Sequence, residues 1–177
     1  TDHPNNGLTT NARQQLNSCL CYLAKSLSAD AKNLAKVANK RTIAESDILS
    51  AVELRFSDAM FIDTMKANTD AVTNFTSKSD SDKKGESRQS KAGLTLPPSI
   101  TEKFLREFGT NSLMVTGGAP ITLCVALEVF TKKLFADAVP LTEKKKKKRV
   151  TIRDLELAVR GSELDKVMKD AKISFLG

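Results

Sequence analysis

One stretch of the sequence constrains the fold more than any other. Residues 10–39 contain no proline or glycine, and their apolar residues recur at spacings of three and four. This periodicity predicts one amphipathic helix about 45 Å long, capped at its start by Thr9 or Thr10. A short following segment cannot bury a stripe of that length, so the helix needs a second long helix as a partner. The apolar positions are Leu16, Leu20, Leu23, Leu27, Ala31, Leu34 and Ala38.

The same succession of elements occurs twice. A long helix, a basic loop and a short helix follow one another in the first half of the chain and again in the second. Both short helices contain an aspartate followed by Ala-Val, in residues 47–52 and 154–159, and each comes after a basic pair, Lys40-Arg41 or Lys148-Arg149. The arginine precedes the aspartate by six residues in one copy and by five in the other. Together these features indicate a repeated unit.

Two such units can bury both helical stripes if the long helices cross. The sequence therefore predicts an all-α fold in which the two halves pair within one chain. Antiparallel crossing would place the loop before one long helix beside the loop after the other. Each such place would combine the free N–H groups of a helix start with Lys and Arg side chains, and both of these attract phosphate.

A polar segment separates the two halves. Residues 77–91 contain no apolar side chain, which is typical of a flexible linker. We therefore expect a first domain in residues 1–77, a linker in residues 78–91 and a second domain in residues 92–177.

Further helices are expected on either side of this linker. One spans residues 58–76, and a short one runs from Pro97 to about Gly109. The second long helix begins in residues 117–120, where a proline suits the first turn. Pro140 lacks a backbone donor, and it should kink this helix or end it early.

The positive charge is concentrated in one loop. The net charge is +7, but residues 1–77 contain eight basic and eight acidic side chains. Six consecutive basic residues, Lys144 to Arg149, supply nearly the whole excess. Such a run is a solvated loop, a nuclear-import signal or a phosphate-binding surface. Its predicted place beside a helix start favours phosphate binding.

Composition argues against several other classes of protein. Aromatic residues make up 5% of the chain and Trp is absent, which disfavours readers that stack bases on aromatic side chains. His3 is the sole histidine, so general-base catalysis is not indicated. Cys19 and Cys21 would lie about 200° apart around a helix, so we expect them and Cys124 to be small core or boundary residues without a metal or cofactor. No apolar run reaches the roughly 18 residues of a membrane span, so no membrane partner is expected.

Short motifs in both halves occur in one known family. The first half contains His3-Pro4-x-x-Gly7, Lys40-Arg41-Thr42-Ile43 and Ala71-Val72-Thr73-Asn74-Phe75-Thr76-Ser77-Lys78. The second contains Gly118-Ala119-Pro120-x-x-Leu123 and Leu155-x-Leu157-Ala158-Val159-Arg160. In this order they resemble the core histones, the first half histone two-B and the second histone two-A. Such a fusion resembles the histone doublets encoded by some large DNA viruses.

The resemblance implies two paired histone folds and no enzymatic activity. It implies sequence-nonspecific binding and compaction of double-stranded DNA in a nucleosome-like particle, together with a histone three/four-type pair or doublet. The location would be the nucleus and its chromatin or, for a viral protein, the viral factory and the virion. The residues that the resemblance and the basic run assign to DNA are Thr9, Lys40, Arg41, Thr42, Arg88, Lys91, Lys103, Arg106, Gly118, Ala119, Lys144, Lys145, Lys146, Lys147, Lys148 and Arg149.

Several residues depart from the family pattern. Met114 replaces the arginine of the first loop of histone two-A. Of the acidic patch that docks partner proteins, Glu128 and Glu163 remain. At its other positions the chain has Ala59, Lys133, Ala136 and Ser162. We therefore do not expect protein docking at this patch.

The two ends of the chain also depart from the pattern. The helix that precedes the Pro4 loop in the family is missing, so the first fold should lack its first helix. Thr1 is not a methionine, and we expect the chain to continue upstream. Lys172-Ile173-Ser174-Phe175 resembles the short strand by which histone two-A docks onto the three/four pair, which predicts a C-terminal docking strand.

A second hypothesis is a regulatory histone-fold module, such as a subunit of a transcription factor. The reduced acidic patch and the lysine run favour DNA packaging over recruitment of proteins. Protection of DNA from nuclease, after reconstitution with a three/four-type pair, would discriminate between the two.

Overall fold

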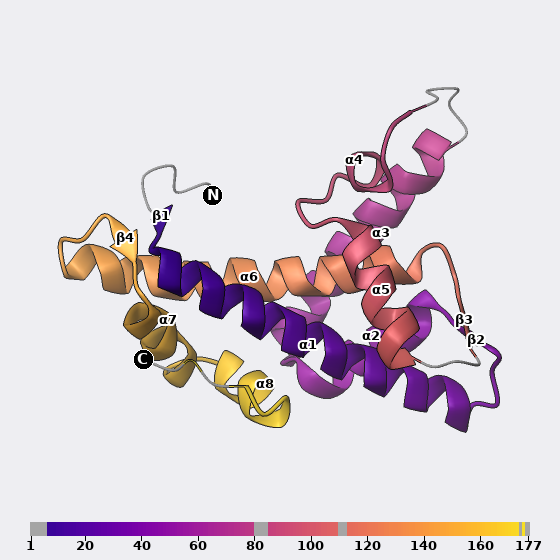
Figure 1. The fold of residues 1–177 in the computed structure, drawn as a ribbon, viewed down its shortest axis with the longest axis horizontal. Helices are drawn as coiled ribbons and strands as arrows, with labels where there is room; N and C mark the ends of the chain where they lie inside the picture. Colours follow the sequence, from indigo (N-terminus) through magenta and orange to yellow (C-terminus); the bar gives the residue numbers. More distant parts are fainter. Residues whose placement is uncertain (1–6, 80–84, 110–112, 174, 176–177) are drawn as a thin grey trace. The chain divides into compact units, whose positions relative to one another are not determined.

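The computed structural model describes residues 7–79, 85–109, 113–173 and 175, and these form an all-α architecture with short two-residue strands (Figure 1). They divide into two compact units. Residues up to 23 together with residues from 130 onward form the terminal unit, and residues 24–129 form the central unit. The two long helices, α1 (Thr10–Val37) and α6 (Ala119–Lys144), each contribute to both. The compact units therefore cut across the division of the sequence into an N-terminal and a C-terminal half.

The terminal unit contains the start of α1 and the end of α6. Two short helices follow α6, α7 (Ile152–Arg160) and α8 (Leu164–Asp170). A parallel pair of strands, β1 (Gly7–Leu8) and β4 (Arg149–Val150), joins the segment before α1 to the segment after α6. Fully buried side chains of the unit include Leu23, Phe130, Leu134, Leu155 and Leu164.

The central unit contains the rest of both long helices and four further helices. These are α2 (Glu45–Arg55), α3 (Asp58–Ser79), α4 (Arg88–Ala92) and α5 (Pro98–Gly109). A second parallel pair, β2 (Thr42–Ile43) and β3 (Met114–Val115), joins the segment after α1 to the segment before α6. One apolar cluster of this unit consists of Ala71, Ala92, Ile121 and Val125, from α3, α4 and α6.

The helices predicted from periodicity are confirmed to within about one turn. The first long helix begins at Thr10, and the Thr9 hydroxyl accepts a hydrogen bond from the Ala12 N–H at 3.3 Å, so Thr9 is the N-cap. The helix that follows α2 runs three residues further than expected, to Ser79. Helices α4 and α8 were not predicted, because five and seven residues carry too little periodicity.

Of the two effects expected of Pro140, a kink or an early end of the second long helix, the early end is wrong. The helix continues for another turn, to Lys144. Val139 and Thr142 are buried, and the Thr142 hydroxyl donates to the Ala138 carbonyl at 3.1 Å. Packing on both sides of Pro140 therefore compensates for its missing N–H group.

Part of the expected linker is helical. The Ser87 hydroxyl accepts from the Ser90 N–H at 3.2 Å and caps α4, which includes Arg88 and Lys91. Residues 80–84 of the linker, and residues 3–6 of the motif that begins at His3, lie outside the described residues.

The described residues of the predicted docking strand form no strand. Lys172 has a left-handed backbone with φ 55°, and the Ile173 N–H donates to the Met168 carbonyl at 2.8 Å. This closing turn of α8 takes Lys172 out of the extended conformation that a strand requires. Phe175 is buried, and Ser174 lies outside the described residues. Across the ranges that the structure describes, no helix has the length and apolar character that crossing a bilayer requires.

Candidate nucleic-acid interface

In the terminal unit, the start of α1 lies beside the basic run. Gly7 pairs with Arg149 and Leu8 with Val150, and the Thr9 N–H donates to the Val150 carbonyl at 3.1 Å (Figure 1). The first N–H groups of a helix have no partner within that helix, so they attract anions. Strand pairing thus holds a helix start and a lysine-rich loop together, which is the combination expected of a phosphate-binding surface.

The basic run forms a tight turn, which we call the terminal-unit loop (Lys144–Arg149). All six of its side chains are exposed. The Lys146 N–H donates to the Glu143 carbonyl at 2.8 Å, and the Lys147 N–H donates to the Thr142 carbonyl at 3.2 Å. The backbone of the loop is therefore fixed by the end of α6, while its side chains are exposed.

One lysine of this loop has an unfavourable backbone conformation. Lys146 is left-handed, with φ 53°, and Asn39 has the same φ at the end of α1. Asparagine adopts this conformation readily, whereas lysine does so at a cost of about 1 kcal/mol. Strain of this kind persists where the surrounding structure imposes it, often at functional sites.

We expect the Lys146→Asn variant to be more stable than the wild type by about 0.5 kcal/mol, because asparagine relieves the left-handed strain. Urea denaturation measures the difference. Lys147→Asn is the control, since it removes the same charge from a residue without positive φ. If both variants gain the same stability, the cause is relief of charge repulsion, and the explanation by backbone strain is wrong.

A fully buried carboxylate holds the end of the terminal-unit loop. Asp154 accepts hydrogen bonds from the Thr151 N–H at 3.0 Å, the Thr151 hydroxyl at 2.8 Å and Lys145 Nζ at 2.5 Å. Burial raises the pKa of Asp154, but these hydrogen bonds outweigh it and lower the pKa to about 2. Asp154 is thus the N3 residue of a capping box at the start of α7. Lys145, predicted to contact DNA, is bound to the protein here.

Asp154 should make folding stability depend on pH in the acid range. Its pKa is about 2 in the fold against an ordinary value of 3.8, so the ionised carboxylate contributes about 2 kcal/mol above pH 4. That contribution is lost as the pH falls from about 4 to about 2. Urea unfolding across this range should show a smaller loss for Asp154→Asn than for the wild type. Parallel curves would contradict the assignment.

The central unit contains a second loop of the same construction, which we call the central-unit loop (Asn39–Thr42). The Lys40 N–H donates to the Ala35 carbonyl at 2.9 Å and closes the turn after α1. Thr42 pairs with Met114, and the Met114 N–H donates to the Arg41 carbonyl at 3.0 Å. These strands place the loop beside the segment that leads into α6 at Gly118 and Ala119.

An aspartate also holds the end of the central-unit loop. Asp47 is buried, and it accepts from the Ala44 N–H at 2.9 Å and from Lys40 Nζ at 2.7 Å. Asp47 and Asp154 are therefore the shared aspartates of the sequence repeat. The repeat has a physical cause, because each aspartate caps a helix and binds a lysine.

The structure corrects the register of the repeat. Asn39 and Lys146 are the left-handed residues, and each precedes its aspartate by eight positions. The two loops therefore have the same length. The spacing from arginine to aspartate differs between the copies because Arg41 and Arg149 are not equivalent positions. Lys40, Arg41 and Thr42 correspond to Lys147, Lys148 and Arg149.

Two further predicted DNA contacts share one acidic partner. Arg88 of α4 forms an ion pair with Glu102, and Arg106 Nη2 lies 2.7 Å from the same carboxylate. The hydrogen bond from Arg88, then that from Arg106, lowers the pKa of Glu102. Lys103 is exposed on α5, and Lys91 of α4 is half-buried. Sequence reasoning missed this cluster, although the Glu102–Arg106 spacing suits a helical ion pair.

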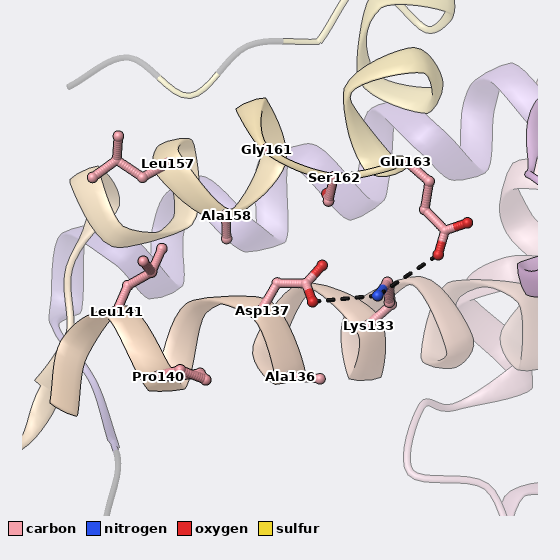
Figure 2. A pocket seen from close by; sticks show the side chains of 10 residues that line it. All are labelled: Lys133, Ala136, Asp137, Pro140, Leu141, Leu157, Ala158, Gly161, Ser162 and Glu163. Carbon is pink, nitrogen blue, oxygen red and sulfur yellow. Dashed lines mark hydrogen bonds and ion pairs between the residues drawn. The ribbon is translucent and has the colours of Figure 1, made fainter. Parts of the chain in front are cut away.

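Glu128 and Glu163, the two residues that the resemblance assigns to a reduced acidic patch, have partners within their own units. Glu128 Oε1 accepts from the N–H groups of Thr95 at 2.6 Å and Leu96 at 2.8 Å. In the terminal unit, Lys133 Nζ lies 3.3 Å from Asp137 and 3.7 Å from Glu163. Figure 2 shows these three side chains lining an open hollow of about 540 Å³ between α6 and the segment after α7. The lysine there neutralises one of the two carboxylates.

Comparison with known proteins gives the family. A model of the core histone domain, which covers histones of the two-A, two-B, three and four types, matches residues 75–161. A histone two-A of Meyerozyma guilliermondii is 37% identical over 52% of this chain and 72% of its own length. The chain belongs to the core histone family. This histone is also similar, at 31% identity over 89% of its length, to a histone doublet joining two-B and two-A from Melbournevirus, and it spans 57% of that protein. A histone two-A of Candida albicans is 35% identical over 53% of this chain and 72% of its own length.

Proteins of the histone family are structural DNA-packaging proteins. Cys19 and Cys124 are buried and Cys21 is half-buried, which agrees with the core or boundary positions expected of them. Burial raises the pKa of Cys19 to about 12 and that of Cys124 to about 11, so both are protonated and weak nucleophiles. Among the residues that the structure describes, no three His, Cys, Asp or Glu side chains form a metal-binding group.

Met114, which was expected from the resemblance to replace an arginine of histone two-A, is 72% exposed in β3. The central-unit loop therefore has an uncharged side chain on the neighbouring strand.

Proposed function

We propose that this histone binds double-stranded DNA without sequence preference and compacts it within a nucleosome-like particle. Its partners would be a histone three/four-type pair or doublet. The observation that carries the proposal is the terminal-unit loop, six exposed basic side chains beside a helix start capped by Thr9. Such groups neutralise phosphates but do not distinguish bases.

Two observations support pairing of the halves within one chain. Each parallel strand pair joins a segment of the first half to a segment of the second, β1 to β4 and β2 to β3. Each pair also includes or adjoins a basic loop. The similarity to a viral histone doublet over most of the chain supports the same arrangement.

Salt titration tests the DNA-binding part of this proposal. Two duplexes of unrelated sequence should bind with affinities within a factor of a few of each other. The logarithm of affinity should fall linearly with the logarithm of salt, with a slope of about −0.9 per neutralised phosphate. A preference of several kcal/mol for one duplex would refute nonspecific binding.

Reconstitution tests the particle. The histone would be mixed with a histone three/four-type pair and linear DNA and then digested with micrococcal nuclease. A protected fragment of defined length supports packaging, whereas assembly with protein partners without protection favours the regulatory alternative. The expected location is chromatin in the nucleus or, if the chain is viral, the viral factory and the virion.

A further inference from the structure

The two loops share a backbone but differ in charge. In the central unit, residues 39–47 contain two basic and two acidic side chains. The equivalent residues 146–154 contain five basic side chains and one acidic side chain. The net charges are 0 and +4. One of the two central acids, Asp47, is bound to Lys40, and the other is Glu45.

Glu45 places its carboxylate at the start of α6. The Thr116 hydroxyl donates to Glu45 Oε2 at 3.3 Å. The other oxygen lies against Gly118, the residue before α6, where an added Cβ would come within 1.7 Å of Glu45 Oε1. A glycine at this position therefore leaves room for the carboxylate. The equivalent residue after the terminal-unit loop is Ile152, which carries no charge.

A carboxylate at this place competes with phosphate. The start of a helix attracts anions through its free N–H groups and its dipole. Glu45 presents such an anion from within the protein, and it repels any phosphate that approaches the same groups. The exposed Arg41 nearby is the basic side chain whose attraction for phosphate it offsets.

We propose that Glu45 acts as a negative determinant of DNA binding at the central-unit loop. Its carboxylate takes the phosphate position at the start of α6 and leaves strong phosphate binding to the terminal-unit loop. This inference rests on the proposed DNA-binding function.

The test compares duplex-DNA binding by the whole chain and by two single variants. Glu45→Gln removes the charge and preserves the shape of the side chain. Glu53→Gln removes the same charge from an exposed position on the same helix, so it controls for net charge. Glu45→Gln should bind more tightly, with a slope steeper by about 0.9, so its advantage should grow about 3.5-fold between 200 and 50 mM salt. Glu53→Gln should keep the wild-type slope.

A second substitution locates the gained contact. Adding Arg41→Gln to the Glu45→Gln variant should remove most of the gain, while Arg41→Gln alone should change wild-type binding little. Circular dichroism checks folding, and Glu45→Ala replaces Glu45→Gln if the latter does not fold.

The possible outcomes distinguish a failure of this inference about Glu45 from a failure of the proposed DNA-binding function. Salt-dependent binding by the wild type, with an unchanged slope in Glu45→Gln, overturns the role of Glu45 alone. An equal gain in Glu45→Gln and Glu53→Gln also overturns it. No salt-dependent binding by the wild type overturns both proposals.

Discussion

Replacing Lys147, Lys148 and Arg149 with glutamine is expected to weaken duplex-DNA binding by roughly a hundredfold at about 0.15 M salt. All three side chains are exposed in the terminal-unit loop, and each would neutralise about one phosphate. The log–log salt slope should become shallower by about 2.7. Fluorescence anisotropy at several salt concentrations measures both quantities. Lys145 and Lys146 are left unchanged, because one binds Asp154 and the other has the strained backbone.

A matched triple variant distinguishes the effect of the loop position from the effect of the total charge on DNA binding. Lys66, Lys132 and Lys166 are exposed lysines on α3, α6 and α8, and their replacement by glutamine removes the same total charge. This control should retain most of the wild-type slope. If both triple variants lose affinity equally, the loop has no special role. An unchanged slope in the loop variant would make the run a solvated loop or an import signal.

Replacing Asp154 with alanine should lower the free energy of unfolding by about 3 kcal/mol. The capping interaction contributes about 1 kcal/mol, and the hydrogen-bonded contact with Lys145 adds a comparable or larger amount. Because Asp154 is completely buried, water cannot replace these contacts without local opening. The melting temperature should fall by about 6–12 °C, as measured by calorimetry.

Another acidic residue of α7 provides the comparison. Glu156 pairs with the exposed Arg160 one turn later, and such a pair contributes about 0.3–0.5 kcal/mol. Glu156→Ala should therefore shift the melting temperature by no more than about 2 °C. Asp47→Ala, in the other copy of the repeat, should resemble Asp154→Ala. If Asp154→Ala melts like Glu156→Ala, the aspartate does not hold the loop.

The sequence was sufficient to predict the main helices but not how they divide into units. Apolar spacing over more than 25 residues identifies α1 directly, since periodicity accumulates with length, and the proline of its first turn marks the start of α6. Helices α4 and α8 are too short for that signal. The continuation of α6 past Pro140 depends on the burial of Val139 and Thr142, which is a tertiary property.

The candidate interface was predictable where it depends on local charge. The run from Lys144 to Arg149 is visible in the sequence, and so is its predicted neighbour, the helix start at Thr9. The capping role of Asp154 was also visible in principle, through its spacing of three from Thr151. The contact of Glu45 with Gly118 was not, because these residues lie far apart in the chain and approach only through the pairing of β2 with β3.

In each basic loop, the residues that determine the backbone conformation are largely distinct from those whose charges would bind a polyanion. A left-handed residue begins each turn and an aspartate ends it, and in the terminal-unit loop the lysine that binds this aspartate, Lys145, is not one of the three residues that follow the left-handed one. The two copies already hold this geometry with very different electrostatics. Substitutions at these exposed positions can therefore change the affinity for a polyanion one charge at a time. The helices and strands that position these residues stay the same.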